Sequence, residues 1–342
     1  KQYDLIRWAK RWEYIDDEVA RKQVVDRVRR YRLKIGIVRY AAVIAVILVS
    51  GVMVWNWKYR SVEPATLATV SVPLTNVPIL KLADGEEIPI SSRNMEIIRS
   101  SRRVDIQLAD SGRLEYVAKS DSMVGQVEYN TLVIPRGCEF NLVLADGSRV
   151  WLNAGSSLKY PETFSNGERR VYLEGEAFFE VTSDSLKPFV VKTAEANVKV
   201  LGTSFNVMNY TDEAKVEVAL LKGKVKFEDT RNRQTRALVP GEVVRMDKAS
   251  TSIVLTKEDV SRVSAWRTGY FYFENMSMEE LVVKLERWYQ VKFTFASEKV
   301  KQMRFTGAVT RYRDLEYVLK MIEKTRDISF VDFGDQIKIY EK

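Results

Sequence analysis

The chain has 342 residues, 46% of them hydrophobic, and no histidine, so the usual general base and the usual neutral metal ligand are both missing. The net charge is +8, but residues 1–39 carry twelve Lys/Arg against six Asp/Glu, whereas residues 58–342 carry 42 against 40. The near-neutral main body gives no support for direct binding of nucleic acid.

Residues 1–34 predict a short α-helical segment. One side of the first helix carries a narrow apolar stripe at spacings of three, four and three residues, formed by Leu5, Trp8, Trp12 and Ile15. So short a segment cannot bury these side chains in a core of its own. The stripe therefore packs either against a partner protein or against residues upstream. Because the chain does not begin with methionine, we expect this segment to be incomplete.

Residues 35–57 predict a single transmembrane helix. The 18 residues from Tyr40 to Trp57 are uncharged. Such a helix is about 27 Å long, close to the hydrocarbon thickness of a bilayer. Arg39, Tyr40, Trp55 and Trp57 are typical membrane-interface anchors. Eight Lys/Arg precede the span between residues 21 and 39, so the positive-inside rule predicts a cytoplasmic N-terminus. A buried core helix or a cleaved signal peptide fits this pattern less well.

A linker over residues 58–80 and a β-rich region over residues 81–260 are expected next. The linker contains three prolines and little periodicity, which is typical of a protease-accessible segment. In the β-rich region, Leu-Ala-Asp-Gly recurs at residues 82–85 and 144–147 between alternating strands, and Asp-Gly favours tight hairpins. The pattern predicts an all-β domain of stacked hairpins, a β-sandwich or a solenoid-like fold.

Residues 266–342 predict a small α+β domain with the order βαβ–βαββ. Ser277 and Glu280 form a capping box at the start of one helix, and Asp314 caps a second. The expected strands lie at residues 271–273, 291–295, 304–309, 328–331 and 336–340. We expect Leu281, Leu285 and Trp288 in the core of this domain.

Several motifs together resemble the FecR domain of anti-sigma regulators. They are residues 144–161 (LADGSRVWLNAGSSLKYP), 170–181 (RVYLEGEAFFEV), 188–191 (PFVV) and 200–207 (VLGTSFNV), in the order typical of that family. Residues 265–291 resemble the C-terminal domain of Bacteroidetes FecR-like proteins, a relative of the signalling domain of TonB-dependent transducers. The joint occurrence of these motifs is far more specific than any one alone.

The resemblance implies a transmembrane anti-sigma factor of the inner membrane, with the bulk of the chain in the periplasm. Its cytoplasmic segment would bind an extracytoplasmic-function sigma factor through Leu5, Trp8, Trp12 and Ile15. Its periplasmic part would receive a signal from the periplasmic domain of a TonB-dependent, SusC-like outer-membrane transducer, with site-specific proteases as further partners. The alternative is a membrane-anchored structural or interaction protein of the cell envelope.

No catalytic triad, metal-ligand set or phosphate-binding loop is present in the sequence, so we expect neither an enzyme nor a cofactor. Cys138 has no second cysteine or histidine to activate it and is interpreted as a small buried residue. The resemblance implies one candidate reaction, self-cleavage in which the Thr203 hydroxyl attacks the Gly202 carbonyl. The alternative at this dipeptide is a glycine in a turn or bulge before a strand.

Overall fold

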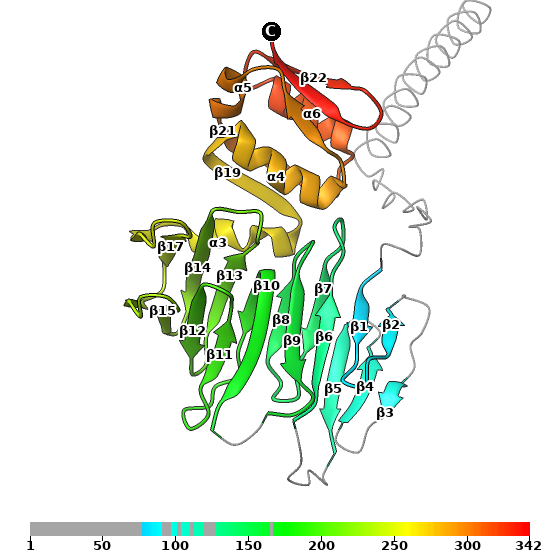
Figure 1. Ribbon diagram of the computed structural model, residues 1–342, viewed down its shortest axis with the longest axis vertical. Coiled ribbons are helices and arrows are strands. Elements are labelled where there is room, and N and C mark those ends of the chain that lie inside the picture. Colours follow the sequence, from blue (N-terminus) through cyan, green and yellow to red (C-terminus); the bar gives the residue numbers. More distant parts are fainter. Residues whose placement is uncertain (1–76, 91–96, 101–103, 110–112, 120–126, 165–166) are drawn as a thin grey trace, which may run out of the picture. The chain divides into compact units, whose positions relative to one another are not determined.

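The computed structural model describes residues 77–90, 97–100, 104–109, 113–119, 127–164 and 167–342 (Figure 1). The predicted cytoplasmic segment, the predicted transmembrane helix and most of the predicted linker lie outside these residues and stay predictions. Across the described ranges, no helix has both the length and the apolar character needed to cross a bilayer.

The β-rich region forms two sheets that share one strand, and we call residues 77–257 the β domain. The first sheet contains, in spatial order, β2 (Glu87–Pro89), β1 (Ile79–Lys81), β6 (Tyr129–Val133), β9 (Ser157–Pro161), β10 (Arg169–Glu180), β11 (Phe189–Lys192), β12 (Ala196–Val200), β15 (Val225–Asp229) and β16 (Thr235–Leu238). The second contains β3 (Ile97–Ser100), β4 (Val104–Leu108), β5 (Leu114–Ala118), β7 (Phe140–Val143), β8 (Arg149–Leu152), β10, β13 (Ser204–Asn209), β14 (Lys215–Lys222), β17 (Glu242–Asp247) and β18 (Ile253–Lys257).

Strand β10 passes from one sheet to the other at Gly175. Residues before Gly175 pair with β9 and β11, and residues from Gly175 onward pair with β8 and β13. Gly175 has a φ of +98°, and a Cβ there would lie 2.7 Å from the Cα of Ser156. Only glycine fits this position, because the backbone is left-handed and another chain segment approaches closely.

Alternating side chains from both sheets form one hydrophobic core. Leu132 and Leu158 of the first sheet and Leu142 and Phe179 of the second are fully buried in the same cluster. The predicted Asp-Gly hairpins are present between β1 and β2 and between β7 and β8, where Gly85 and Gly147 have positive φ. The prediction of a β-rich fold is therefore confirmed.

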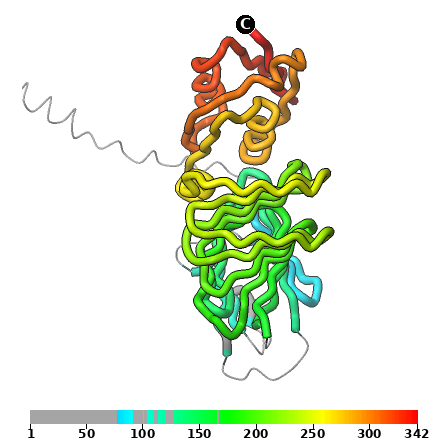
Figure 2. Tube along the Cα trace, turned by 90° about the vertical axis from the view of Figure 1, so that its left-hand side faces the viewer, coloured from blue at the N-terminus to red at the C-terminus, as the bar shows by residue number. Residues whose placement is uncertain are grey.

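A connector of α3 (Val260–Val263) and the 3₁₀ helix η2 (Ala265–Thr268) leads to the C-terminal module, residues 270–342 (Figure 2). The module contains β19 (Tyr270–Ser277), α4 (Met278–Tyr289), β20 (Phe293–Phe295), α5 (Glu298–Gln302), β21 (Arg304–Thr310), α6 (Leu315–Glu323), β22 (Ile328–Asp332) and β23 (Ile337–Glu341). The predicted order of strands and helices is found, with α5 added. The Ser277–Glu280 capping box is present at α4.

The strands of the module form two small sheets. β19 pairs with β21 as a two-stranded ribbon, while β20, β23 and β22 form a three-stranded sheet. Leu281 and Leu285 are buried in the module's core, as expected. Trp288 differs, because it is only partly buried and its ring lies beside Tyr312 and Phe271.

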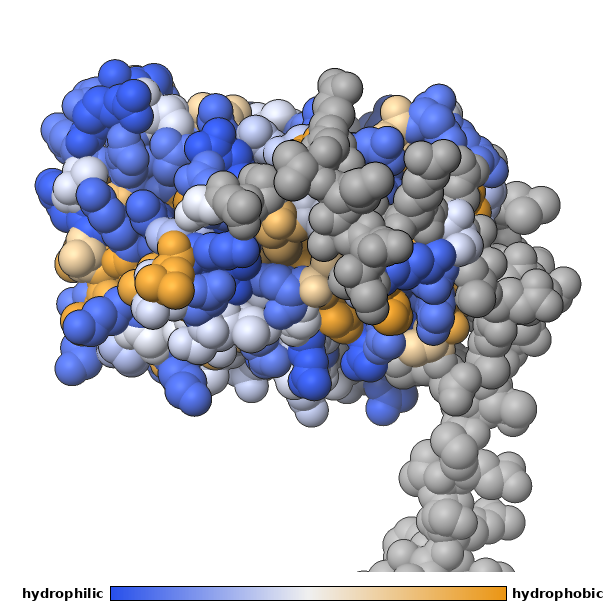
Figure 3. All heavy atoms as spheres, turned by 90° about the horizontal axis from the view of Figure 1, so that it is seen from below, coloured by the Kyte–Doolittle hydropathy of each residue, from blue (hydrophilic) through white to orange (hydrophobic). Residues whose placement is uncertain are grey.

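The uncovered part of the face in Figure 3 is mostly hydrophilic. Hydrophobic residues form small separate groups there rather than one wide patch. Scattered groups of this kind are normal for a soluble surface and do not mark a binding site.

Candidate functional site

The connector is anchored to the β domain by Trp266. This side chain is 6% exposed, and its indole Nε1 donates a hydrogen bond to Asn206 Oδ1 at 3.2 Å. The next residue, Arg267, places its guanidinium 3.5 Å from the ring centroid of Phe178. Phe178 lies on the second half of β10, so the connector covers the face of that strand that points away from the main core.

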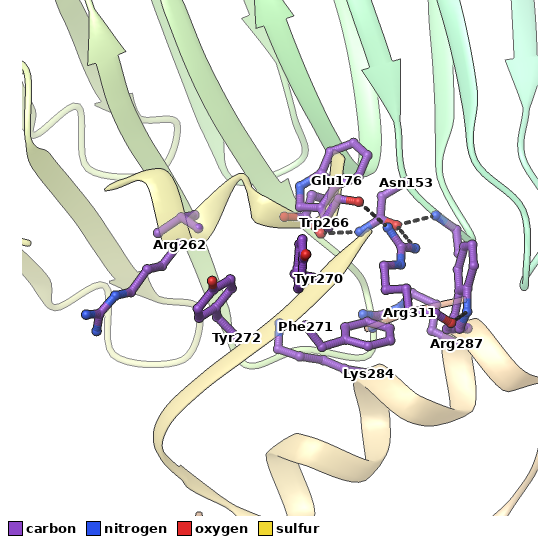
Figure 4. Close-up of a pocket in the computed structure, with 13 residues that line it drawn as sticks. Asn153, Glu176, Arg262, Trp266, Tyr270, Phe271, Tyr272, Lys284, Arg287 and Arg311 are labelled. Carbon is purple, nitrogen blue, oxygen red and sulfur yellow. Dashed lines mark hydrogen bonds between the residues drawn. The ribbon is translucent and has the colours of Figure 1, made fainter. Parts of the chain in front are cut away.

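Arg311, which follows β21, crosses from the C-terminal module into the β domain (Figure 4). Its side chain is 1% exposed, its Nη2 donates to Asn153 Oδ1 at 2.7 Å, and its Nη1 donates to Glu139 Oε2 at 3.1 Å. The same Nη1 donates to the Trp266 carbonyl at 3.0 Å, and the guanidinium lies 3.7 Å from the Trp288 ring centroid. Burial lowers the pKa of Arg311, but a guanidinium in a protein stays protonated.

Glu176 of β10 ties these contacts into one buried network. Its carboxylate, in a residue that is 7% exposed, accepts hydrogen bonds from Asn153 Nδ2 at 2.6 Å and from Asn206 Nδ2 at 2.9 Å. Asn153 also binds Arg311, and Asn206 also binds Trp266. The buried Glu176 carboxylate and the buried Arg311 guanidinium are thus joined through the amide group of Asn153, which hydrogen-bonds to both charges away from water.

Arg287 of α4 makes a second connection. Its Nη2 lies 2.9 Å from Asp212 Oδ1 and its Nη1 lies 2.8 Å from Glu213 Oε1, while the guanidinium lies 3.4 Å from the Tyr210 ring centroid. Desolvation alone lowers the pKa of Arg287, but Tyr210, Glu213 and Asp212 outweigh it, and the net pKa is raised. The charged form is therefore stabilised by its partners in the β domain.

A loop of the β domain closes over the end of α4. The Gly137 N–H donates to the Arg287 carbonyl at 2.9 Å, and Gln290 Nε2 donates to the Arg136 carbonyl at 2.8 Å. Tyr312 donates its hydroxyl to Glu139 Oε1 at 2.7 Å, and burial, together with Glu139, raises the pKa of Tyr312 to about 12. These contacts, with those of Arg311 and Arg287, define what we call the junction.

The junction encloses a cavity of about 60 Å³. Four cationic side chains and one carboxylate, Glu176, line it together with aromatic rings. Typical ligand pockets have volumes of about 300–1,000 Å³, so this cavity is too small for an organic cofactor. Within the described ranges, no group of three or more Cys, Asp or Glu side chains is placed to hold a metal ion. The contacts of the junction are suited to holding the two modules together.

The predicted self-cleavage dipeptide lies between β12 and β13. A Cβ at Gly202 would lie 2.7 Å from the Cα of Ser183, so close backbone approach accounts for the glycine. The Thr203 hydroxyl is buried and donates to the carbonyl of Lys224 at 3.1 Å. Cleavage itself stays a prediction.

The other predicted site residues are placed as follows. The predicted sigma-factor-binding residues and membrane-interface anchors lie outside the described residues; they are Leu5, Trp8, Trp12, Ile15, Arg39, Tyr40, Trp55 and Trp57. Cys138 is partly buried against the core of the β domain, and burial raises the pKa of its thiol.

Sequence reasoning missed the junction residues Arg311, Arg287 and Glu176. One signal was available, because Ala177, Phe178 and Phe179 are consecutive apolar residues in a strand that otherwise alternates. Such a run indicates a strand that is buried on both faces, and the connector buries the face that points away from the main core.

Comparisons with known proteins agree with the sequence motifs. The model for FecR protein matches residues 130–226, and the model for FecR, C-terminal matches residues 270–339. A search of curated proteins found no match. Two crystal structures of a candidate anti-sigma factor from Parabacteroides distasonis ATCC 8503, at 1.65 and 2.50 Å resolution, are each 32% identical to this chain with a TM-score of 0.59.

These matches cover 62% and 63% of this chain and 99% of each crystallised chain. A relative of this identity, matched over nearly its whole length, shows common ancestry as well as a common fold. The chain therefore belongs to the FecR family, with a FecR domain followed by a FecR C-terminal domain.

Proposed function

We propose that the chain is an anti-sigma factor that carries a signal across the inner membrane. The observation that carries this proposal is the 32% identity to a candidate anti-sigma factor over 99% of that protein's crystallised chain. The partner on the cytoplasmic side would be an extracytoplasmic-function sigma factor. It would be held by the stripe of Leu5, Trp8, Trp12 and Ile15.

The partner on the periplasmic side would be the signalling domain of a TonB-dependent, SusC-like outer-membrane transducer. The distribution of charge around the predicted span at residues 35–57 supports this topology, since eight Lys/Arg precede it and only Lys58 and Arg60 follow closely. A lone membrane helix transmits changes of shape poorly. Signal output would therefore require site-specific proteolysis near residues 58–80 or a change in how the periplasmic modules are assembled.

The junction supports the second route. The connector and the C-terminal module are held to the β domain by a small number of buried polar contacts, centred on Arg311 and Arg287. Withdrawal of one partner from a buried charge of this kind is strongly destabilising, because the remaining charge is left buried without compensation. A transducer that competes for the C-terminal module would thus alter the junction in a nearly all-or-none way.

Co-purification of the full chain with the cell's sigma factors tests the cytoplasmic half of the proposal. Trp8→Ala combined with Trp12→Ala removes the apolar stripe and is expected to abolish co-purification. Lys10→Ala combined with Tyr14→Ala alters the opposite side of the same helix and is the matched control. Equal retention of a sigma factor by both double variants, or by neither, contradicts the assigned surface.

A reporter fused after residue 60 tests the topology, and activity in the periplasm is expected. A reporter that is active in the cytoplasm would place signal receiver and output on the same side and overturn the relay. Self-cleavage between Gly202 and Thr203 is tested separately, by the mass of the purified chain. A single intact species removes that prediction without affecting the relay.

A further inference from the structure

A second hollow, much larger than the junction cavity, lies between the β domain and the C-terminal module. Its volume is about 1,130 Å³, and we call it the groove. On one side it is lined by residues of β14 and β17, including Lys215, Glu217 and Arg245. On the other it is lined by β19, β21 and the first turns of α4, including Tyr272 and Ala308.

The groove is acidic, whereas the main body of the chain is close to neutral. Nine carboxylate side chains line it against five cationic ones. Glu274 and Glu279 are two of the exposed carboxylates in this lining. Glu279 makes no hydrogen bond or ion pair within 4 Å to the described residues, and Glu274 pairs only with Arg262, at 2.9 Å, in a pair that is more than half exposed on both sides. Exposed pairs of this kind contribute little and exchange partners readily.

Two cations of the groove lining, Arg245 and Lys284, already interact with carboxylates of the protein. Arg245 lies 2.5 Å from Glu217 and 2.6 Å from Glu258. Desolvation acts to lower the pKa of Lys284, but Glu213, Glu176 and Glu217 outweigh it, and the net pKa is raised. Nine carboxylates against five cations leave the groove lining with an excess of four negative charges, which attracts cations and repels anions.

One wall of the groove is a two-stranded ribbon with an open face and an open edge. Phe273 and Val309 point into the module's core, whereas Tyr272 and Ala308, which face each other across the ribbon, are exposed on the opposite face. β19 pairs with β21 along one edge, and no described strand pairs with its other edge.

The hydrogen-bond pattern shows which backbone groups this open edge offers. The Arg311 N–H donates to the Gly269 carbonyl at 2.8 Å, which makes those two residues a hydrogen-bonded pair. Hydrogen-bonded and non-hydrogen-bonded pairs alternate in an antiparallel ribbon, so the backbone groups of Tyr270 and Tyr272 point away from β21. Both tyrosine residues are more than 40% exposed, and their ring centroids lie 6.1 Å apart. They lie where a cation bound at this edge could contact a ring face.

We propose that the groove binds an extended, lysine- or arginine-rich segment of another polypeptide, which adds as a strand to the open edge of β19. The backbone groups of Tyr270 and Tyr272 supply main-chain hydrogen bonds, and alternate cationic side chains reach Glu274 and Glu279. Because both modules line the groove, an occupied groove favours the arrangement in which they stand as described here. Sigma-factor binding is separable from this interaction, since it uses the opposite end of the chain.

Fluorescence anisotropy with the purified 342-residue chain tests the proposal. The probe is a labelled decapeptide of alternating lysine and valine, and the matched probe alternates glutamate and valine. We expect saturable binding of the lysine peptide that weakens as salt increases, and no binding of the glutamate peptide. Glu274→Gln combined with Glu279→Gln should weaken binding about five- to tenfold.

The matched control is Glu316→Gln combined with Glu341→Gln, which removes the same charge from exposed carboxylates outside the groove lining. Ala308→Trp fills the open face without changing charge and should weaken binding at least tenfold. Equal weakening by both carboxylate pairs, or an unchanged affinity in Ala308→Trp, overturns the assignment. Displacement of the labelled peptide by spermidine at the same concentration as by unlabelled peptide also overturns the assignment, because charge alone would then account for binding.

Discussion

Replacement of Arg311 by alanine withdraws the central contact of the junction. The change leaves Asn153 Oδ1, the Trp266 carbonyl and Glu139 without the donor that now lies within 3.1 Å of each. Each acceptor keeps one other donor, namely the Ala154 N–H, the Gly269 N–H and the Tyr312 hydroxyl. The loss is therefore that of three hydrogen bonds from a buried charged group, each worth about 1.5–3 kcal/mol before the remaining donors compensate in part, and withdrawal of one buried charged partner costs about 3–5 kcal/mol in total. We therefore expect Arg311→Ala to lower the free energy of unfolding by about 4 kcal/mol.

Urea unfolding followed by tryptophan fluorescence measures this loss, because Trp266 and Trp288 both contact Arg311. Amide hydrogen exchange of Arg311→Ala should show reduced protection at the connector and at the end of β21. Arg313→Ala is the matched control, since Arg313 is an exposed arginine two residues away, and its removal should leave the unfolding free energy unchanged within error. If the two variants unfold at the same urea concentration, the junction does not stabilise the structure as reasoned here.

Two further predictions concern single positions. Gly202→Ala drives a methyl group into the backbone at Ser183, so the unfolding free energy should fall by about 1–3 kcal/mol, and an unchanged thermal midpoint would contradict the close approach. The pKa of Tyr312 is raised from 10.0 to about 12, so the folded state holds this proton more tightly than the unfolded state and stability falls as pH rises from about 10 to 12. Tyr312→Phe should flatten that fall relative to wild type, and an identical pH profile would show that the hydroxyl bond to Glu139 has no effect on stability.

Local chemistry explains which parts of the fold could be predicted. Asp-Gly pairs fix tight hairpins within a few residues of themselves, and the Ser277–Glu280 capping box fixes the start of α4, so both were found from sequence. The junction has no such local signature. Arg311 contacts Asn153 and Glu139, which lie 158 and 172 positions away along the chain. Nothing near Arg311 distinguishes it from an ordinary surface arginine.

The pairing of strands was beyond sequence reasoning for a related reason. Alternation predicts that residues 169–180 form a strand, but it does not say that the two halves pair with different neighbours. The strand changes partners at Gly175, where a positive φ and the close approach of Ser156 both exclude a side chain. A glycine in a strand suggests an irregularity, but not what lies opposite it.

Because β10 pairs with strands of both sheets, the two sheets are joined by a continuous backbone strand and cannot separate without breaking its hydrogen bonds. Glu176 stands one residue beyond the crossing, directly beneath the contacts to Asn153 and Asn206. A pull exerted there is borne by a strand whose neighbours include β8, β9, β11 and β13. A force applied to β10 therefore acts on both sheets, and we expect the β domain to unfold cooperatively.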